Sequence, residues 1–342
     1  MNTLQEMDQE NHYCLISNGP ILFKATNPLW EKFEGRLPQK ELGALWMQCR
    51  TPLIASSLGL DVFWGTRHQL PLFLSRNVKA ALTVHDIVHL LFPETMSLPI
   101  LMAERLFMRR SIRRADHVIA VSGSTASGIQ DHYRVKAQKI SVIYPGSPIS
   151  SEQDRSKSFN DEKLPEKYFL FVGTLEPRKN LKTILNAFSL LDPEKKGIDL
   201  LVVGNIGWKN KELLAILNSN RFRSRVHLKG YVDDDRLSYM YKHAVCLLYP
   251  SLYEGFGFPI LEAMHRGVPV ITSNVASMPE VAGDAALLVD PADAQGLAEA
   301  MNRILMNDDL RNNMISKGYE RVRQFSWERC AEETLAIFNQ WG

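Results

Sequence analysis

The sequence has few cysteines, and none has the spacing of a metal or disulfide site. Cys14, Cys49, Cys246 and Cys330 lie far apart, and no two of them form a C-x-x-C pair. This spacing excludes a zinc ribbon and a disulfide framework, and it is typical of reduced thiols in a cytoplasmic protein. We therefore expect a cytoplasmic protein without a structural metal.

Long apolar runs and an excess of one charge are also absent. No run approaches the roughly 18 to 20 apolar residues that a membrane span needs. The first residues, MNTLQEMDQENHY, are too polar and acidic for a signal peptide. The 40 basic and 38 acidic residues leave a net charge of +2, unlike the strong basic excess of nucleic-acid binders. We expect a soluble protein, at most peripheral to a membrane, with no nucleic-acid partner.

What the sequence does contain is a regular alternation of short apolar runs and amphipathic segments. Strands that alternate with helices indicate crossover units and a parallel sheet that is buried on both faces. With 342 residues, the chain is long enough for two such domains. The runs are YCLIS (13–17), DVFWG (61–65), AALTVHD (80–86), HVIAVS (117–122), ISVIYPG (140–146), YFLFVG (168–173), DLLVVG (199–204), VHLKGYV (226–232), VCLLYPS (245–251), VPVIT (268–272) and ALLVD (286–290).

A polar segment divides these runs into two groups. ISSEQDRSKSFNDEK (149–163) has almost no large apolar side chains, which predicts an exposed connection between domains. We expect an N-terminal domain over 1–150 and a C-terminal domain over 164–324. The first domain lacks the usual first strand with its glycine-rich turn, because no glycine precedes Gly19. We interpret the chain as beginning inside what would have been the first helix.

A basic turn follows the run at 168–172. In GTLEPRKN, Arg178 and Lys179 come after Gly173 and just before a helix that begins near Asn180. Ligands of open α/β sheets bind outside the carboxyl ends of the strands, and cations beside a helix N-terminus attract anions. The alternative is a solvated basic turn in which Asn180 caps the helix.

A second glycine-rich turn follows the run at 245–251, in the stretch YEGFGFPILEAM (253–264). Gly255 and Gly257 allow close approach of the backbone to a ligand. Pro259 is suited to the start of a helix, where we expect the amides around Ile260 and Leu261 to lack intrahelical acceptors. These features predict a phosphate site.

Two acids flank this turn. Glu262, taken as a first-turn residue, would complement the helix dipole, and Glu254 alone could be a solvated acid. A solvated acid does not explain Glu254 in a tight Gly-Phe-Gly loop at the end of a strand.

At this point the sequence resembles the retaining glycosyltransferases of family 4, which have the GT-B fold. EGFGFPILEAMHRGVPVITS and GTLEPRKN carry the resemblance, together with TVHD (83–86), VSGSTAS (121–127) and GYVDDDRL before PSLYEGFG. It extends from about residue 80 to the end and is weaker over 12–79. It implies two doubly wound Rossmann-like domains that face one another across a cleft. FSWERCAEETLAIF resembles the terminal helix, here 325–342, that crosses back to the N-terminal domain.

The resemblance also implies a role for each matching residue. Glu254 would accept hydrogen bonds from the donor sugar, and Glu262 would bind the ribose hydroxyls of the nucleotide. His85 would touch and orient the sugar; the alternative is a satisfied imidazole at the end of a strand. Asp86 beside it could hold the tautomer of His85 or cap the next helix. The implied diphosphate and backbone contacts come from Gly173, Arg178, Lys179, Gly255, Gly257, Phe258, Ile260 and Leu261.

One position departs from the family pattern. Many members have an arginine directly after the glycine of the first turn, where this chain has Thr174. We expect Arg178 to take over the phosphate contact.

Two further charged features have competing interpretations. Asp233, Asp234 and Asp235 could bind a metal, but N-cap and first-turn roles are favoured, and the resemblance implies a reaction without a metal. Arg105, Arg109 and Arg113 have the i, i+4 spacing of one helical face. They could contact anionic lipid headgroups, although a solvated face is favoured. Ser122, Ser124 and Thr125 are interpreted as helix caps and not as nucleophiles.

The resulting hypothesis is sugar transfer, with retention, from a nucleoside diphosphate sugar to a saccharide or lipid-linked acceptor in surface-polysaccharide synthesis. Within the family that the sequence resembles, the GTLEPRKN motif is typical of mannosyl or rhamnosyl transfer, so GDP-mannose is the favoured donor. No cofactor is expected. The alternative is an N-terminally truncated, non-catalytic nucleotide-sugar-binding protein or partner subunit. A dinucleotide oxidoreductase is disfavoured because no G-x-G-x-x-G follows a strand.

Overall fold

The computed structural model describes residues 1–35, 43–147, 164–191, 197–208, 211–217, 219 and 222–341. The chain divides into two compact units. The first comprises Met1–His85, Pro99–Gly146 and Ser326–Gly342, and the second comprises Asp86–Leu98 and Ser147–Phe325. The expected connection at 149–163 lies outside the described residues. All four cysteines are free thiols.

The first unit is built around a parallel sheet of order β3-β4-β5-β6. The central strand β4 is buried from Ala80 to Val84, which explains its continuous apolar sequence. The elements of the first unit are α1 (Asn2–Met7), β1 (Tyr13–Ser17), β2 (Trp30–Glu34), α2 (Gly43–Ser57), β3 (Val62–Gly65), β4 (Lys79–Val84), α4 (Leu98–Arg114), β5 (His117–Ala120), α5 (Gly123–Tyr133), the 3-10 turn Ala137–Lys139 and β6 (Ile140–Val142).

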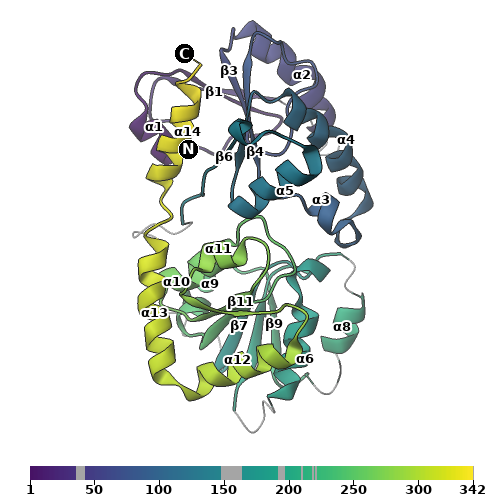
Figure 1. Ribbon diagram of the computed structural model, residues 1–342, viewed down its shortest axis with the longest axis vertical. Coiled ribbons are helices and arrows are strands. Elements are labelled where there is room, and N and C mark those ends of the chain that lie inside the picture. The colour runs from purple at the N-terminus through teal and green to yellow at the C-terminus, as the bar shows by residue number, and fades with distance from the viewer. Residues whose placement is uncertain are drawn as a thin grey trace. The chain divides into compact units, whose positions relative to one another are not determined.

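The N-terminal segment of this unit forms a separate layer. Strands β1 and β2 pair in parallel with each other, and α1 packs against α14 (Trp327–Phe338). Figure 1 shows these two helices side by side although they come from distant parts of the sequence. Leu4, Trp30 and Ala331 are buried together between them. The first unit therefore includes both ends of the described chain.

The second unit is a doubly wound domain with a parallel sheet of order β12-β11-β10-β7-β8-β9. Helix α6 packs against α12, and α10 packs against α13 (Figure 1). Its elements are α3 (Val88–Leu91), the 3-10 turn Pro93–Thr95, β7 (Tyr168–Val172), the 3-10 turn Pro177–Lys179, α6 (Leu181–Leu190), β8 (Asp199–Val203), α8 (Lys211–Leu217), β9 (Val226–Gly230), α9 (Asp234–Lys242), β10 (Cys246–Tyr249), α10 (Phe258–His265), β11 (Val270–Ser273), α11 (Met278–Ala282), β12 (Ala286–Val289), α12 (Ala294–Met306) and α13 (Asp308–Val322).

The strand order places a topological switch point in the middle of this sheet. From β7 the chain proceeds outward through β8 and β9, and then returns to the other side of β7 with β10. Ligands of doubly wound sheets bind at the carboxyl ends of the strands that flank such a point. Both motifs predicted from sequence, GTLEPRKN after β7 and YEGFGFPILEAM after β10, begin at this position.

One segment groups differently from the expected division at residue 150. Asp86–Leu98 belongs to the second unit, because its backbone is bound there. The Ile87 amide donates to Tyr253 Oη at 3.3 Å, and the Trp208 indole donates to the Thr95 carbonyl. The ring of Phe92 lies 5.8 Å from that of Tyr253.

No helix in the described part of the chain is both long enough and apolar enough to cross a bilayer.

Candidate functional site

The candidate site is a cluster of charged side chains at the carboxyl ends of β7 and β10. Arg178 ends the turn after β7, and its guanidinium reaches the loop after β10. Its Nη1 donates to the Tyr253 carbonyl at 2.7 Å and to Glu254 Oε2 at 2.5 Å. Its Nη2 donates to Glu176 Oε1 at 2.5 Å. Arg178 thus joins the two motifs that the sequence predicted to form one site.

Lys179 makes the second link between the two strands. Its Nζ donates to Glu254 Oε1 at 2.7 Å and to Tyr249 Oη at 2.9 Å, and it lies 5.2 Å from the centre of the Tyr249 ring. Both oxygens of Glu254 are therefore bound by cations. Only 10% of the Glu254 side chain is exposed, so this is a largely dehydrated ion cluster.

The charges of this cluster cancel. Glu176 and Glu254 carry two negative charges, and Arg178 and Lys179 carry two positive ones. Burial acts to raise the pKa of Glu254, but Lys179 and Arg178 hold this pKa below its ordinary value. Burial acts to lower the pKa of Lys179, but Tyr249 and Glu254 raise it above its ordinary value. Arg178, Lys179 and Glu254 are therefore ionised at neutral pH.

The cations retain hydrogen-bonding capacity. An ammonium has three N–H groups and a guanidinium has five. Lys179 uses two and Arg178 uses three in the bonds described above. Within the described part of the chain, one donor of Lys179 and two of Arg178 have no acceptor, so they could bind a ligand such as a phosphate.

The glycine turn leads directly into helix α10. Gly257 precedes the helix with φ of +118°, a left-handed conformation that favours glycine. The Phe258 ring meets that of Phe256 edge to face at 5.1 Å. The expectation for Ile260 was wrong, because its amide donates to the Gly257 carbonyl at 3.1 Å. This bond joins residues three positions apart, as in a 3-10 turn, so the Ile260 amide has an acceptor within the first turn of the helix.

Glu262 lies further into the helix than expected. It is the fifth residue of α10, and the first turn contains no acid, so a first-turn role was wrong. Its Oε2 accepts a hydrogen bond from Tyr241 Oη at 2.9 Å. Among the described residues no group donates to its Oε1. Burial raises the pKa of the Glu262 carboxyl above its ordinary value, against the Tyr241 hydrogen bond and the Arg266 charge.

Several supporting residues at this site were missed by the sequence interpretation. Asn180 does not cap α6 with its side chain. Its Nδ2 donates to the carbonyls of Pro250 and Pro291 at 2.9 and 2.7 Å. Ser277 Oγ lies 2.9 Å from the Glu254 carbonyl and 2.6 Å from the Phe256 carbonyl. These contacts join segments far apart in sequence, so no local pattern marks them.

Gly204 allows the ends of β7 and β8 to approach closely. It follows β8 with φ of +139°, and Gly173 after β7 has φ of +151°. A Cβ atom on Gly204 would lie 2.1 Å from the Gly173 carbonyl oxygen. A side chain at Gly204 would therefore displace the turn that carries Arg178 and Lys179.

His85, the other predicted catalytic residue, lies in the first unit at the end of β4. Its Nε2 is 2.8 Å from the Thr66 carbonyl, which fixes the ring. The neighbouring Asp86 does not hold this nitrogen. Instead, Asp86 Oδ1 accepts from the Val88 amide at 3.1 Å, at the start of α3.

The structure confirms two predicted helix caps. Asp233 precedes α9, and its Oδ1 accepts from the Arg236 amide at 2.9 Å. Ser122 precedes α5, and its Oγ accepts from the Thr125 amide at 3.0 Å. Ser124 and Thr125 lie inside α5, so the cap prediction was wrong for these two.

The three arginines of α4 face solvent. Arg105, Arg109 and Arg113 are all exposed. The same helix also exposes apolar side chains at i, i+4 spacing, with Leu98 69%, Met102 57% and Leu106 67% exposed. These apolar side chains lie on the same face of α4 as the three arginines, because the two sets are three and seven residues apart.

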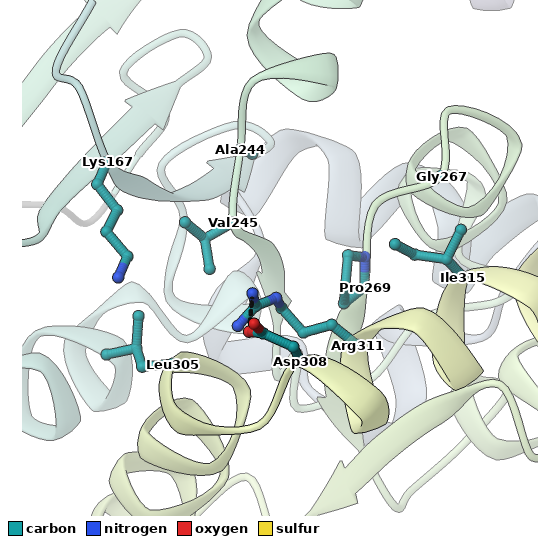
Figure 2. Close-up of a pocket in the computed structure, with 9 residues that line it drawn as sticks. All are labelled: Lys167, Ala244, Val245, Gly267, Pro269, Leu305, Asp308, Arg311 and Ile315. Atoms are coloured by element: carbon teal, nitrogen blue, oxygen red, sulfur yellow. Dashed lines mark hydrogen bonds and ion pairs between the residues drawn. The ribbon is translucent and has the colours of Figure 1, made fainter.

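A cavity of about 330 Å³ lies elsewhere on the second unit, as Figure 2 shows. Lys167, Val245 and Pro269 line it and directly precede β7, β10 and β11. It is therefore at the amino ends of the strands, opposite the charged cluster. Asp308 and Arg311, which pair with each other, form another wall. None of the predicted site residues lines this cavity.

Comparison with known families agrees with this arrangement. Residues 152–321 match the family described as Glycosyl transferases group 1, and residues 29–150 match Glycosyltransferase Family 4. Together the two matches extend over most of the chain.

Two curated relatives and one solved structure are similar over most of their length. O-antigen chain mannosyltransferase B of Escherichia coli is 33% identical over 287 residues, which cover 81% of this chain and 74% of that protein. O-antigen chain mannosyltransferase RfbU of Salmonella typhimurium is 30% identical over 271 residues, covering 78% and 72%. Sucrose-phosphate synthase from Thermosynechococcus elongatus superposes with a TM-score of 0.75 at 21% identity, covering 96% and 88%. The structural likeness confirms the predicted GT-B fold.

Proposed function

This chain belongs to the family 4 glycosyltransferases, and we propose that it transfers a hexosyl group from a nucleoside diphosphate sugar to a hydroxyl of a saccharide or lipid-linked acceptor. Relatives named as O-antigen chain mannosyltransferases support a place in surface-polysaccharide synthesis and favour mannose as the sugar. The observation that carries the proposal is the ion cluster of Arg178, Lys179 and Glu254 at the switch point of the second unit.

The diphosphate of the donor would bind the N–H groups that remain on Arg178 and Lys179. In the structure, Glu254 neutralises these cations and holds them in a dehydrated site. We propose that the diphosphate replaces Glu254 as their counter-ion. The released carboxylate would then accept hydrogen bonds from hydroxyls of the sugar. Glu254 thus acts first as a placeholder for the diphosphate and then as a sugar ligand.

Glu262 would bind the ribose. Its Oε2 is held by Tyr241, and its Oε1 is available to accept from a ribose hydroxyl. Hydroxyl donors would stabilise the ionised form that burial disfavours. Nucleotide binding should therefore lower the pKa of Glu262.

The proposed reaction forms a bond between the acceptor oxygen and the anomeric carbon while the bond from that carbon to the diphosphate breaks. Negative charge develops on the departing phosphate oxygen, where Arg178 and Lys179 would stabilise it without a metal ion. The acceptor proton passes to that same oxygen. Attack from the face that the diphosphate leaves retains the anomeric configuration.

Two substitutions test the division of roles within the site. Glu262→Ala should weaken GDP binding roughly 10- to 100-fold, because it removes a charged acceptor worth about 1.5–3 kcal/mol. Glu254→Ala should bind GDP at least as tightly as the wild type, because it frees two cations, yet it should lose sugar transfer. Titration calorimetry with GDP and UDP measures nucleotide binding by the two variants. Weaker GDP binding by Glu254→Ala would contradict the placeholder role.

A thermal-shift screen of nucleoside diphosphate sugars addresses the donor. Stabilisation by GDP-mannose above all others, followed by mannosyl transfer, would support the proposal. A response to UDP-sugars alone would rule out GDP-mannose as the donor. Binding of a donor without transfer to any acceptor would favour a non-catalytic nucleotide-sugar-binding protein.

We also propose that α4 contacts a membrane surface. Arg105, Arg109 and Arg113 would meet anionic headgroups, while Leu98, Met102 and Leu106 insert beside them. This arrangement would bring the first unit to a lipid-linked acceptor.

A further inference from the structure

His85 is held at three points within the first unit. Its backbone amide donates to His68 Nε2 at 3.0 Å. Its carbonyl accepts from Thr125 Oγ1 at 3.4 Å, and its ring Nε2 lies 2.8 Å from the Thr66 carbonyl. The residue at the end of β4 therefore has both its backbone and its ring fixed by side chains and loops of this unit.

The chemistry of these partners determines which ring nitrogens carry protons. A backbone amide can only donate, so His68 Nε2 must accept and cannot be protonated. The proton of neutral His68 is then on Nδ1, which faces Glu104 Oε2 at 3.3 Å. A carbonyl can only accept, so His85 Nε2 carries a proton, and in neutral His85 the accepting nitrogen is Nδ1.

His68 is held in a costly backbone conformation to reach this position. Its φ is +50°, the left-handed region that residues with a Cβ atom seldom adopt. The His68 amide donates to the Thr83 carbonyl on β4 at 3.0 Å. The side chains of His68 and Glu104 are only 15% and 18% exposed. Strain of this kind is found where a site requires a particular placement.

We infer that Glu104 and His68 are positioning residues that fix the location and tautomer of His85 for sugar transfer. Glu104 orients the His68 ring, and His68 holds the His85 backbone at the end of β4. The inference rests on the proposed function, because it concerns the placement of His85, which the family resemblance implies would orient the donor sugar. It adds to that function two side chains that touch neither substrate.

Substitutions at His68 separate positioning from backbone conformation. The amide oxygen of Gln lies about as far from the backbone as Nε2 of His, whereas that of Asn is one bond shorter. Asn, however, tolerates a left-handed φ better than Gln. His68→Gln should therefore keep most of the turnover and His68→Asn should lose it. If His68 had a purely structural role, His68→Asn should keep more turnover than His68→Gln, because tolerance of the left-handed backbone would then determine the loss.

The loss should be in kcat. A displacement of His85 by about 1 Å can cost roughly 100-fold in rate, while the donor is bound by the second unit, so its KM should stay near the wild-type value. Glu104→Gln keeps an acceptor for His68 Nδ1 and should be milder than Glu104→Ala. His132→Asn on the exposed face of α5 is the matched control and should leave kcat unchanged.

The imidazole protons can be observed without any turnover. Long-range proton–nitrogen correlation spectra of the histidine-labelled full chain should show His68 protonated on Nδ1 and His85 on Nε2. His68 protonated on Nε2, or equal kcat for His68→Asn and His68→Gln, would overturn the inference. A wild-type chain that transfers no sugar from any donor would overturn the proposed function instead, and the observed tautomers would still decide whether His68 holds His85 in this way.

Discussion

Glu254 Oε1 lies 2.7 Å from Lys179 Nζ, and this ion pair joins the ends of β7 and β10. The pair is largely buried, and Arg178 binds the other carboxylate oxygen. These contacts explain why an acid lies in a predicted anion site. Without Glu254, Arg178 and Lys179 would be dehydrated side by side with only Glu176 as a counter-ion.

Glu254→Ala should therefore destabilise the unliganded chain. Removing one partner of a buried ion pair costs about 3–5 kcal/mol, which should appear as a lower melting temperature. Because the diphosphate of GDP can replace the lost carboxylate, added GDP should restore more stability to this variant than to the wild type. Thermal unfolding with and without GDP measures both effects.

Glu333→Ala is a suitable control, since it breaks the exposed pair of Glu333 with Arg329 on α14. Exposed pairs contribute little to stability, so its melting temperature should match that of the wild type. An equally small effect of Glu254→Ala would contradict the description of its cluster as dehydrated.

Glu262→Gln should stabilise the chain at neutral pH. Burial raises the pKa of Glu262 above its ordinary value of 4.5, so the folded state binds a proton more tightly than the unfolded chain. The free energy of unfolding then falls as pH rises from 4.5 through the raised pKa. Each unit of that rise is worth about 1.4 kcal/mol. Gln avoids this loss because it cannot ionise and can still accept from Tyr241.

Melting temperatures measured across pH test the sign of this effect. The gain of Glu262→Gln over the wild type should be full at neutral pH and should vanish as pH falls to 4.5. A variant that is less stable than the wild type at neutral pH would show that the carboxylate is stabilised by the fold instead.

Gly204→Ala should disrupt the charged cluster from a distance. The added Cβ would lie 2.1 Å from the Gly173 carbonyl oxygen, at a φ of +139°. We expect a loss of roughly 3 kcal/mol or more in the free energy of unfolding, from backbone strain and overlap together. Gly230→Ala is the matched control, because Gly230 has φ of +65° but open space around it. It should lose only about 1–2 kcal/mol.

Replacing Arg105, Arg109 and Arg113 by Glu should release the chain from anionic vesicles. A basic residue near such a surface contributes about 1 kcal/mol, so removal of three should weaken binding roughly 100-fold or more. Sedimentation with phosphatidylglycerol vesicles measures the bound fraction, and phosphatidylcholine vesicles should bind neither protein. Equal sedimentation of the variant and the wild type would remove the membrane role of α4.

The control for this experiment reverses three exposed charges on other elements. Lys136, Arg303 and Arg323 are exposed residues outside α4, and their replacement by Glu changes the net charge by the same amount. This control should sediment like the wild type.

Much of the fold could be predicted from the sequence because parallel strands are marked locally. Runs such as YFLFV and CLLY became the buried strands β7 and β10, since strands covered on both faces have only apolar positions. Arg178 and Glu254 were predicted to share a site for a related reason. The carboxyl ends of neighbouring parallel strands meet at one edge of the sheet.

The remaining features depend on contacts between distant segments. The pairing of Glu254 with the cations, the bonds of Asn180 to two prolines and the grouping of Asp86–Leu98 with the second unit all join residues far apart in sequence. Such contacts follow no helical or strand period. His68 was overlooked for the same reason, because its left-handed backbone and its bond to the His85 amide leave no periodic signal.

The packing of α14 has a consequence for how the chain is made. Ile337 on α14 completes a buried cluster with Ile119 and Ile143, and Ala331 covers Leu4 and Trp30. These partners are synthesised long before α14, whereas every segment of the second unit precedes it. On the ribosome the second unit can therefore mature first. The first unit can complete its packing only after α14 has emerged.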